Sequence, residues 1–85
     1  MIRTEVTIKL KSGINARPAA MLVQIASQFR SDIHIETDNK RMNAKSIMGM
    51  MALGLDEGEV VTIATAGEDE EEAAAAIAGY LTNRE

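Results

Sequence analysis

The sequence predicts an α+β fold in which three helices pack on one face of an antiparallel sheet. Two strand patterns follow one another over residues 32–42 without a helix between them, whereas helical patterns separate the other strands. Neighbouring strands of this kind favour antiparallel pairing, so the predicted element order is β-α-β-β-α-β-α. The chain has 85 residues, which is the length of one small domain, and we expect a single domain over residues 1–85.

The first half of the chain predicts strands on either side of a long helix. Residues 2–10 alternate apolar and polar side chains, as a half-buried strand does. Residues 16–29 carry apolar side chains at helical spacing, and Pro18 fits there only in the first turn, with Asn15 as the N-cap. Alternation returns over residues 32–37, breaks at a polar turn and then resumes briefly.

The second half predicts a short helix, a strand and a final helix. Ser46 is a typical N-cap for a helix over residues 47–53. Residues 59–66 are rich in β-branched side chains and predict a strand. Acidic residues over 69–72 predict a capping box at the start of a helix over residues 70–83. The pattern leaves the strand order open, and a ferredoxin-like order is compatible with it.

Composition excludes several classes of protein. The chain has no cysteine, which excludes disulfides, thiolate zinc sites and thiol catalysis. No apolar run is long enough to span a membrane, and residues 1–10 lack the apolar core of a signal peptide, so we expect a cytoplasmic protein. The only histidine, His34, lies in a strand pattern, and the acidic run is contiguous rather than at ligand spacing, so we expect no metal site and no cofactor.

Charge is divided unevenly along the chain. The net charge of −4 arises from nine basic and 13 acidic residues, but residues 1–50 hold eight of the basic ones and only four acidic ones. The first half is therefore the part that attracts anions. Direct nucleic-acid binding is not expected, because the basic residues are scattered and aromatic residues make up only 2% of the chain.

Residues 13–20, with the sequence GINARPAA, form the first candidate site. A glycine turn leads into a helix N-terminus, where free backbone N–H groups and the helix dipole favour an anion. Arg17 lies in the first turn, where the dipole disfavours a cation, so one interpretation is that it holds a phosphate or a carboxylate. The other is a solvated arginine behind an ordinary asparagine cap, and spacing alone favours this one.

Residues 43–53, with the sequence NAKSIMGMMAL, form the second candidate site. At helical spacing the apolar side chains fall on two arcs, formed by Ile47, Met48 and Met51 and by Met50 and Leu53. A short helix on one side of a small sheet buries one arc and leaves the other for a partner, and a helix buried on both sides is the alternative. A phosphoryl group on Ser46 would lie at the positive end of the helix dipole, close to Lys45.

Together these motifs resemble the HPr family of the bacterial phosphotransferase system. The resemblance covers the whole chain in length and element order, and the segments GINARPA and KSIMGMM match two specific family motifs. It implies an open-faced β-sandwich with strand order 1-4-2-3 and three helices on one face. It also implies a protein that is not an enzyme.

Asn15 departs from the family pattern, because the family has a phosphorylated histidine at this position. A carboxamide nitrogen is neither a nucleophile nor a leaving group, since its lone pair is delocalised into the carbonyl. The resemblance therefore implies the regulatory branch of the family, in which Ser46 is phosphorylated by the HPr kinase/phosphorylase. The phosphoprotein is then the corepressor of the LacI-type catabolite control repressor in carbon catabolite repression.

The partner surface implied by the resemblance lies on two helices. It consists of Asn15, Arg17, Ala20, Val23, Gln24, Lys45, Ser46, Ile47, Met48 and Met51. This makes the arc of Ile47, Met48 and Met51 the exposed one. The alternatives are a phosphocarrier of the phosphoenolpyruvate-dependent sugar phosphotransferase system and an adaptor or inhibitor of a metabolic enzyme. A homodimer formed by exchange of an element is compatible with the sequence.

Overall fold

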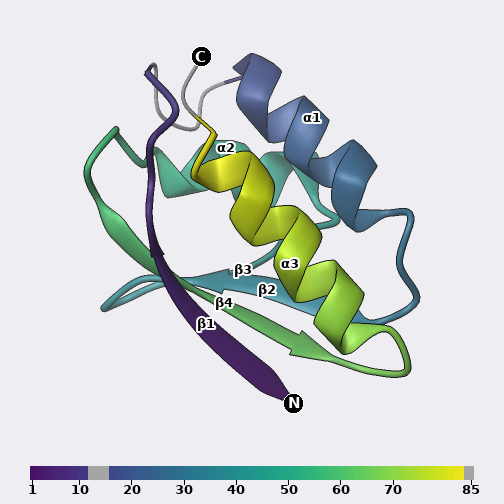
Figure 1. Cartoon of the computed structure of the whole chain (residues 1–85). Helices are drawn as coiled ribbons and strands as arrows, with labels where there is room; N and C mark the ends of the chain where they lie inside the picture. Colours follow the sequence, from purple (N-terminus) through teal and green to yellow (C-terminus); the bar gives the residue numbers. More distant parts are fainter. Residues whose placement is uncertain (12–15, 84–85) are drawn as a thin grey trace.

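The element order of the structure is the predicted one. A computed structural model describes residues 1–11 and 16–83 of the chain. The elements are β1 (Ile2–Thr7), α1 (Ala16–Ala26), β2 (Asp32–Glu36), β3 (Arg41–Asn43), α2 (Ile47–Leu53), β4 (Val60–Ala66) and α3 (Glu70–Leu81), as Figure 1 shows. No helix among the described residues is long and apolar enough to cross a membrane.

The strands form a four-stranded antiparallel sheet in the order β1-β4-β2-β3. β4 is central, so Thr62 stands opposite Glu5 of β1 on one side and opposite Glu36 of β2 on the other. The order 1-4-2-3 implied by the family resemblance is confirmed. This order settles the question that the alternation of side chains had left open.

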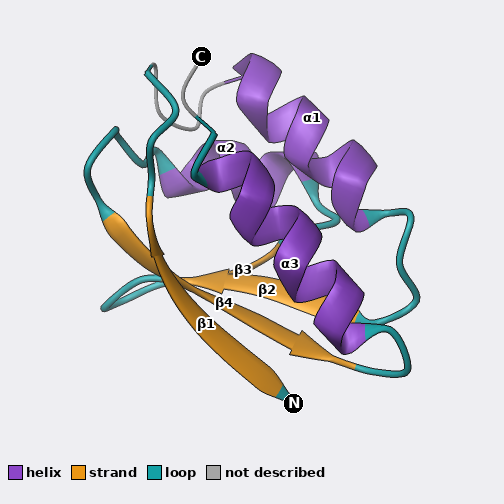
Figure 2. Ribbon diagram, viewed as in Figure 1, coloured by secondary structure: helices purple, strands orange, loops and turns teal. Residues whose placement is uncertain are grey.

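The three helices cover one face of the sheet (Figure 2). α3 contacts β1 and β4, α2 contacts β3, and α1 packs on α2 and α3. Because side chains alternate along a strand, each strand presents its apolar side to the helices. The buried strand residues on this side include Ile33, Ile35, Val61 and Ile63. The core therefore lies between the sheet and the helices, and the opposite sheet face stays open.

Two predicted elements are three residues shorter in the structure, whereas the strands over 32–37 and 59–66 and the helix over 70–83 each lose only one or two. β1 ends at Thr7 rather than at residue 10, because the chain then turns toward α3 and the Lys9 N–H donates to the Leu81 carbonyl at 2.8 Å. α1 ends at Ala26 rather than at residue 29, and the Phe29 N–H donates to the Ala26 carbonyl in a tight turn. Phe29 still packs against the core, which explains why its helical spacing extended the prediction.

The predicted capping box at residues 69–72 is wrong. Asp69 precedes α3, but its carboxylate makes no cap hydrogen bond within that helix, and Glu72 is exposed. The carboxylate instead accepts the Arg30 N–H, the Ser31 N–H and the Ser31 hydroxyl, at 2.9, 2.9 and 2.5 Å. These bonds lower the pKa of Asp69 to about 2, and the bond from the Ser31 hydroxyl has the largest effect. Asp69 therefore joins the start of α3 to the segment before β2.

Candidate partner-binding site

Ser46 caps α2 as predicted. Its backbone is extended, with φ −108° and ψ 115°, and its Oγ accepts the Gly49 N–H at 3.0 Å. The helix ends at Gly54, which adopts the left-handed conformation with φ 57°. The Ser46 side chain is half-buried, so the hydroxyl is held at the start of the helix without being enclosed.

Gly49 leaves room beside the Ser46 hydroxyl. A Cβ at this position would lie 3.3 Å from Oγ and 3.4 Å from Cβ of Ser46, which is tighter than most Cβ contacts. A side chain at position 49 would therefore crowd any group attached to the hydroxyl. Gly49 could not be singled out from the sequence, because its proximity to Ser46 depends on the cap geometry.

The two sides of α2 differ sharply in exposure. Met50 and Leu53 are 0% and 5% exposed, whereas Ile47, Met48 and Met51 are 48%, 79% and 47% exposed. The arc that we expected to be exposed is the exposed one, and the alternative of a helix buried on both sides is wrong. A short helix with three large apolar side chains in solvent is typical of an interaction surface.

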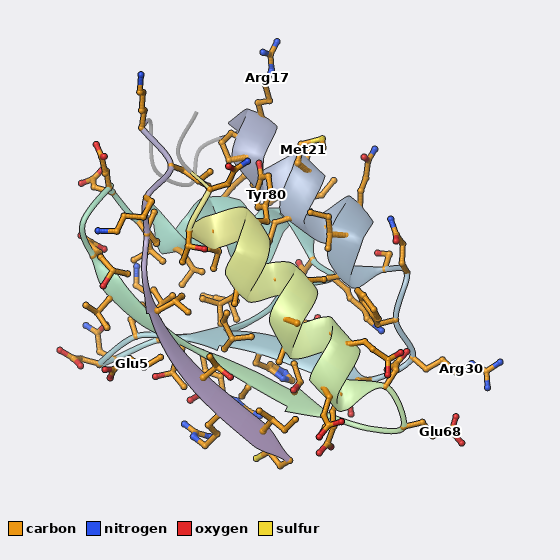
Figure 3. All side chains as sticks on the ribbon, in the orientation of Figure 1. Glu5, Arg17, Met21, Arg30, Glu68 and Tyr80 are labelled. Atoms are coloured by element: carbon orange, nitrogen blue, oxygen red, sulfur yellow. The ribbon has the colours of Figure 1, made fainter. Side chains whose placement is uncertain are left out.

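The predicted contact residues on α1 differ in exposure. Arg17 and Gln24 are exposed, whereas Ala20 and Val23 are half-buried and Val23 packs against the core. The Arg17 side chain points away from the body of the protein (Figure 3). Met21, four residues after Arg17, is 43% exposed and was not in the predicted set. Its i, i+4 spacing from Arg17 on the predicted helix was the signal that could have found it.

Lys45 is already engaged within the protein. Its Nζ donates to the Phe29 carbonyl at 2.8 Å, and its backbone N–H donates to Oδ1 of Asn43 at 2.8 Å. The side chain is half-buried. The ammonium group therefore links the start of α2 to the segment after α1, and the role of Lys45 as a partner contact stays a prediction.

Asn15 lies outside the described residues, so its predicted roles as N-cap and partner contact stay predictions. His34 lies in β2, between the buried Ile33 and Ile35 and on the sheet face away from the helices. The sheet therefore lies between the His34 side chain and the layer of helices that includes α1, where Arg17 lies. In residues 1–11 and 16–83 no group of three or more histidine or carboxylate side chains could hold a metal ion.

Comparison with known proteins gives relatives of two kinds. The family model for the PTS HPr component phosphorylation site, where PTS is the phosphotransferase system, matches residues 2–83. The HPr-like protein Crh of Halalkalibacterium halodurans is 48% identical over 81 residues, which cover 95% of this chain and 96% of that protein. The structure of the phosphocarrier protein HPr from Bacillus anthracis str. Ames is 50% identical, with a TM-score of 0.91 and coverage of 94% of this chain and 95% of that one.

A third relative is the Crh protein of Bacillus subtilis. Its crystal structure is 46% identical to this chain, with a TM-score of 0.80 and coverage of 100% of this chain and 98% of that one. It was described as an intertwined dimer with a swapped domain. Phosphocarrier and Crh relatives are thus similar to this chain to nearly the same degree, so the identity percentages do not separate the two kinds. The chemistry of individual residues must therefore distinguish a phosphocarrier from a Crh-like protein.

Proposed function

The chain belongs to the HPr family, and from this premise we propose that it is a regulatory phosphoprotein rather than a phosphocarrier or an enzyme. The HPr kinase/phosphorylase phosphorylates Ser46, and the phosphorylated form binds the LacI-type catabolite control repressor as its corepressor. The protein acts in the cytoplasm as a single domain and reaches DNA only through the repressor. The observation that carries the proposal is Asn15, at the position of the family's phosphorylated histidine.

The chemistry of residue 15 separates the two kinds of relative. A histidine imidazole offers a nitrogen lone pair that can attack phosphorus, and it leaves readily when the phosphoryl group moves on. The nitrogen of the Asn15 carboxamide has no available lone pair, because resonance with the carbonyl delocalises it. Relay of a phosphoryl group from phosphoenolpyruvate through this position is therefore not expected, even though Arg17 of the same motif is present.

Ser46 keeps what phosphorylation requires. In the proposed step its Oγ attacks the γ-phosphorus of ATP, the bond from that phosphorus to the ADP oxygen breaks, and the hydroxyl proton passes to a base of the kinase. Its half-buried side chain and the absent Cβ at Gly49 support access of the kinase to the hydroxyl. The new group adds about −1.5 to −2 charges next to the apolar arc of α2.

The exposed surfaces of α1 and α2 suit the proposed partner. Ile47, Met48 and Met51 offer an apolar anchor, and methionine adapts its shape to a partner surface. Among the described residues Arg17 has no ion-pair partner, so it is free for an acidic group of the repressor. The phosphate would pair with cations of the repressor and thereby make binding depend on the kinase.

Labelling with ATP and the purified kinase tests the proposal. We expect one phosphoryl group per chain, located on Ser46 by peptide mass spectrometry, and none on a Ser46→Ala variant. Calorimetric titration of the repressor should then give at least a roughly tenfold higher affinity for the phosphorylated chain, since charge-assisted hydrogen bonds are added. Equal affinity before and after labelling would overturn the corepressor role.

A phosphocarrier role is the second candidate, and the similarity to the Bacillus anthracis phosphocarrier favours it. It requires labelling by phosphoenolpyruvate and the first enzyme of the phosphotransferase system. We expect no label on this chain, and we expect Asn15→His to restore some labelling because Arg17 is present. Label on the unaltered chain would establish the carrier role instead, and an unlabelled Asn15→His variant would show that more than residue 15 has changed.

A homodimer by strand exchange is the assembly that we propose, with the Bacillus subtilis relative as its support. In the part of the chain that the structure describes, β1 is an edge strand that pairs only with β4, so a second copy can supply the same strand to that position. Light scattering across a range of protein concentrations should show a monomer converting slowly to a dimer. A constant monomer mass over that range would contradict the exchange.

A further inference from the structure

α2 holds three methionines in very different environments. Met48 and Met51 are 79% and 47% exposed, whereas Met50 is 0% exposed. All three lie within the seven residues of Ile47–Leu53, so they share the same backbone conformation and neighbouring sequence. Exposure is the property that separates them, and oxidation of methionine by peroxides depends on access to the sulfur.

We propose that Met48 and Met51 form a reversible oxidation site that switches off the apolar surface of α2. The inference rests on the proposed function, because these residues and Ile47 form the surface assigned there to the repressor. The oxidant is a peroxide, and hydrogen peroxide is the probe for the test. The two sulfurs share one helix face, since residues three apart in a helix are neighbours.

The chemical step needs no reactant besides the peroxide. The thioether sulfur attacks one peroxide oxygen, an S–O bond forms and the O–O bond breaks. The second oxygen leaves as hydroxide and takes the proton of the transferred OH group, which gives water. The sulfur is oxidised by two electrons and the peroxide is reduced by two. The product, methionine sulfoxide, is returned to methionine by methionine sulfoxide reductases.

The positions of the methionines make the switch selective. Oxidation of Met48 and Met51 replaces two of the three exposed apolar side chains of α2 by polar sulfoxides and leaves only Ile47. Met50 belongs to the hydrophobic core, where a sulfoxide would disrupt packing, and its burial protects it. The fold therefore survives oxidation while the binding surface is lost. Met21 of α1 is 43% exposed, so peroxide reaches it as well, and its oxidation is followed separately.

Peroxide titration followed by peptide mass spectrometry tests the site. The unphosphorylated and the phosphorylated chain are each treated with hydrogen peroxide and then with the A and B sulfoxide reductases. We expect Met48 and Met51 to gain one oxygen roughly tenfold faster than Met50, with an unchanged circular dichroism spectrum, and to lose it again with the reductases. Oxidation of Met50 at the rate of Met48, or sulfoxides that resist both reductases, would overturn the proposal.

Two further readouts test the consequence. Oxidation should shorten retention on a phenyl hydrophobic-interaction column, and it should lower the repressor affinity of the phosphorylated chain roughly tenfold. The matched control is the double variant Met48→Leu, Met51→Leu, which keeps side-chain volume but has no sulfur at these positions. Peroxide should change both readouts much less for this variant, because of its methionines only Met1 and Met21 remain exposed. A loss as large as that of the unaltered chain would contradict the proposal.

The outcomes separate the two proposals. If the unoxidised phosphorylated chain does not bind the repressor, the proposed function fails. Column retention and mass spectrometry then still decide whether the oxidation site exists. If the unoxidised chain binds and the oxidised chain binds equally well, the proposed function stands and the switch is overturned. A separate Met21→Leu variant shows whether oxidation on α1 accounts for any of the lost affinity.

Discussion

The starts of α2 and α3 differ in how one polar side chain is used. At α2, Ser46 turns its hydroxyl to its own helix and accepts the Gly49 N–H at 3.0 Å. At α3, Asp69 turns its carboxylate away from its own helix and accepts three hydrogen bonds from Arg30 and Ser31. The first contact is local, whereas the second joins residues 38 and 39 positions apart.

A glycine close to each helix start shows what the difference means. A Cβ on Gly67, just before α3, would lie only 2.6 Å from Oγ of Ser31, whereas a Cβ on Gly49 would lie 3.3 Å from Oγ of Ser46. The start of α3 is therefore closed by packing, and its polar contacts stabilise the fold. The start of α2 has room beside its hydroxyl, and this suits a site of modification.

Replacement of Gly67 by alanine tests the closed region and should have the largest effect. The added Cβ would meet Oγ and Cα of the buried Ser31 at 2.6 and 2.7 Å, and Gly67 has φ +150°, which L side chains rarely adopt. We expect Gly67→Ala to lower the free energy of unfolding by about 2–4 kcal/mol, through overpacking and backbone strain. Urea unfolding followed by circular dichroism measures the loss.

Gly58→Ala is the matched control for this variant. Gly58 also has a positive φ, of +93°, but a Cβ there would have no atom within 4 Å. Only the backbone strain of a side chain at positive φ remains, so we expect the free energy of unfolding to fall by about 1 kcal/mol. Equal losses for the two variants would mean that the contact with Ser31 contributes nothing and that the region is less closed than the distances indicate.

Gly49→Ala tests whether the open region serves phosphorylation. The new methyl group would stand 3.3 Å from Oγ of Ser46, so we expect the kinase to label this variant roughly tenfold more slowly, which corresponds to about 1.4 kcal/mol in the barrier. Stability should change by less than about 1 kcal/mol, because the helix propensity of alanine offsets the crowding.

Gly79→Ala controls for the helix propensity of alanine. Gly79 lies in α3, and a Cβ there would have no atom within 4 Å. We expect this variant to gain up to about 1 kcal/mol of stability and to be labelled at the normal rate. A normal labelling rate for Gly49→Ala as well would show that the space beside Ser46 has no role in access.

Much of the fold follows from local patterns in the sequence. Burial on one side of a strand or helix leaves a periodic trace, so all seven elements and the two arcs of α2 were predictable. The choice of the exposed arc came from the family resemblance. The ends of elements were harder to predict. Phe29 packs against the core beyond the end of α1, so its position in the sequence has the spacing of a further helical turn. Strand order depends on contacts between distant segments, and here it came from the family resemblance.

The polar contacts of the site were harder to predict than its apolar surface. Lys45 donates to the Phe29 carbonyl, and Asp69 accepts from Ser31, although both side chains suggested local roles at helix starts. Nothing in the local sequence indicates partners 16 and 38 residues away. Such contacts are set by the packing of helices on the sheet, which the periodic patterns do not encode.

The cap at α2 should contribute a smaller amount of stability than the contacts of Gly67. Ser46→Ala removes the acceptor for the Gly49 N–H, and we expect a loss of about 1 kcal/mol in urea unfolding. Ser46→Asp keeps a cap acceptor and should stay within a few tenths of a kcal/mol of the unaltered chain. If Ser46→Asp loses as much as Ser46→Ala, the hydrogen bond to Gly49 is not what holds the start of α2.

The two helix starts also differ in titration, because Asp69 at the start of α3 is an acid and Ser46 at the start of α2 is not. The pKa of Asp69 is lowered from 3.8 to about 2, chiefly by the hydrogen bond from the Ser31 hydroxyl. The folded state thus binds this proton less tightly than the unfolded state. Asp69 therefore stabilises the fold fully above about pH 4, and this contribution is lost as the pH falls toward 2.

Comparison with an Asp69→Asn variant isolates this titration from that of Glu70, whose pKa is also lowered, chiefly by the Gly67 N–H donor. We expect the difference in urea midpoint between the unaltered chain and Asp69→Asn to be constant from pH 7 to about pH 4 and to shrink below it. Glu68→Gln is the control, because the ion pair of Glu68 with Arg30 spans 3.8 Å between highly exposed side chains. A difference that stays constant down to pH 2 would mean that the contacts of Asp69 with Arg30 and Ser31 do not depend on the charge of its carboxylate.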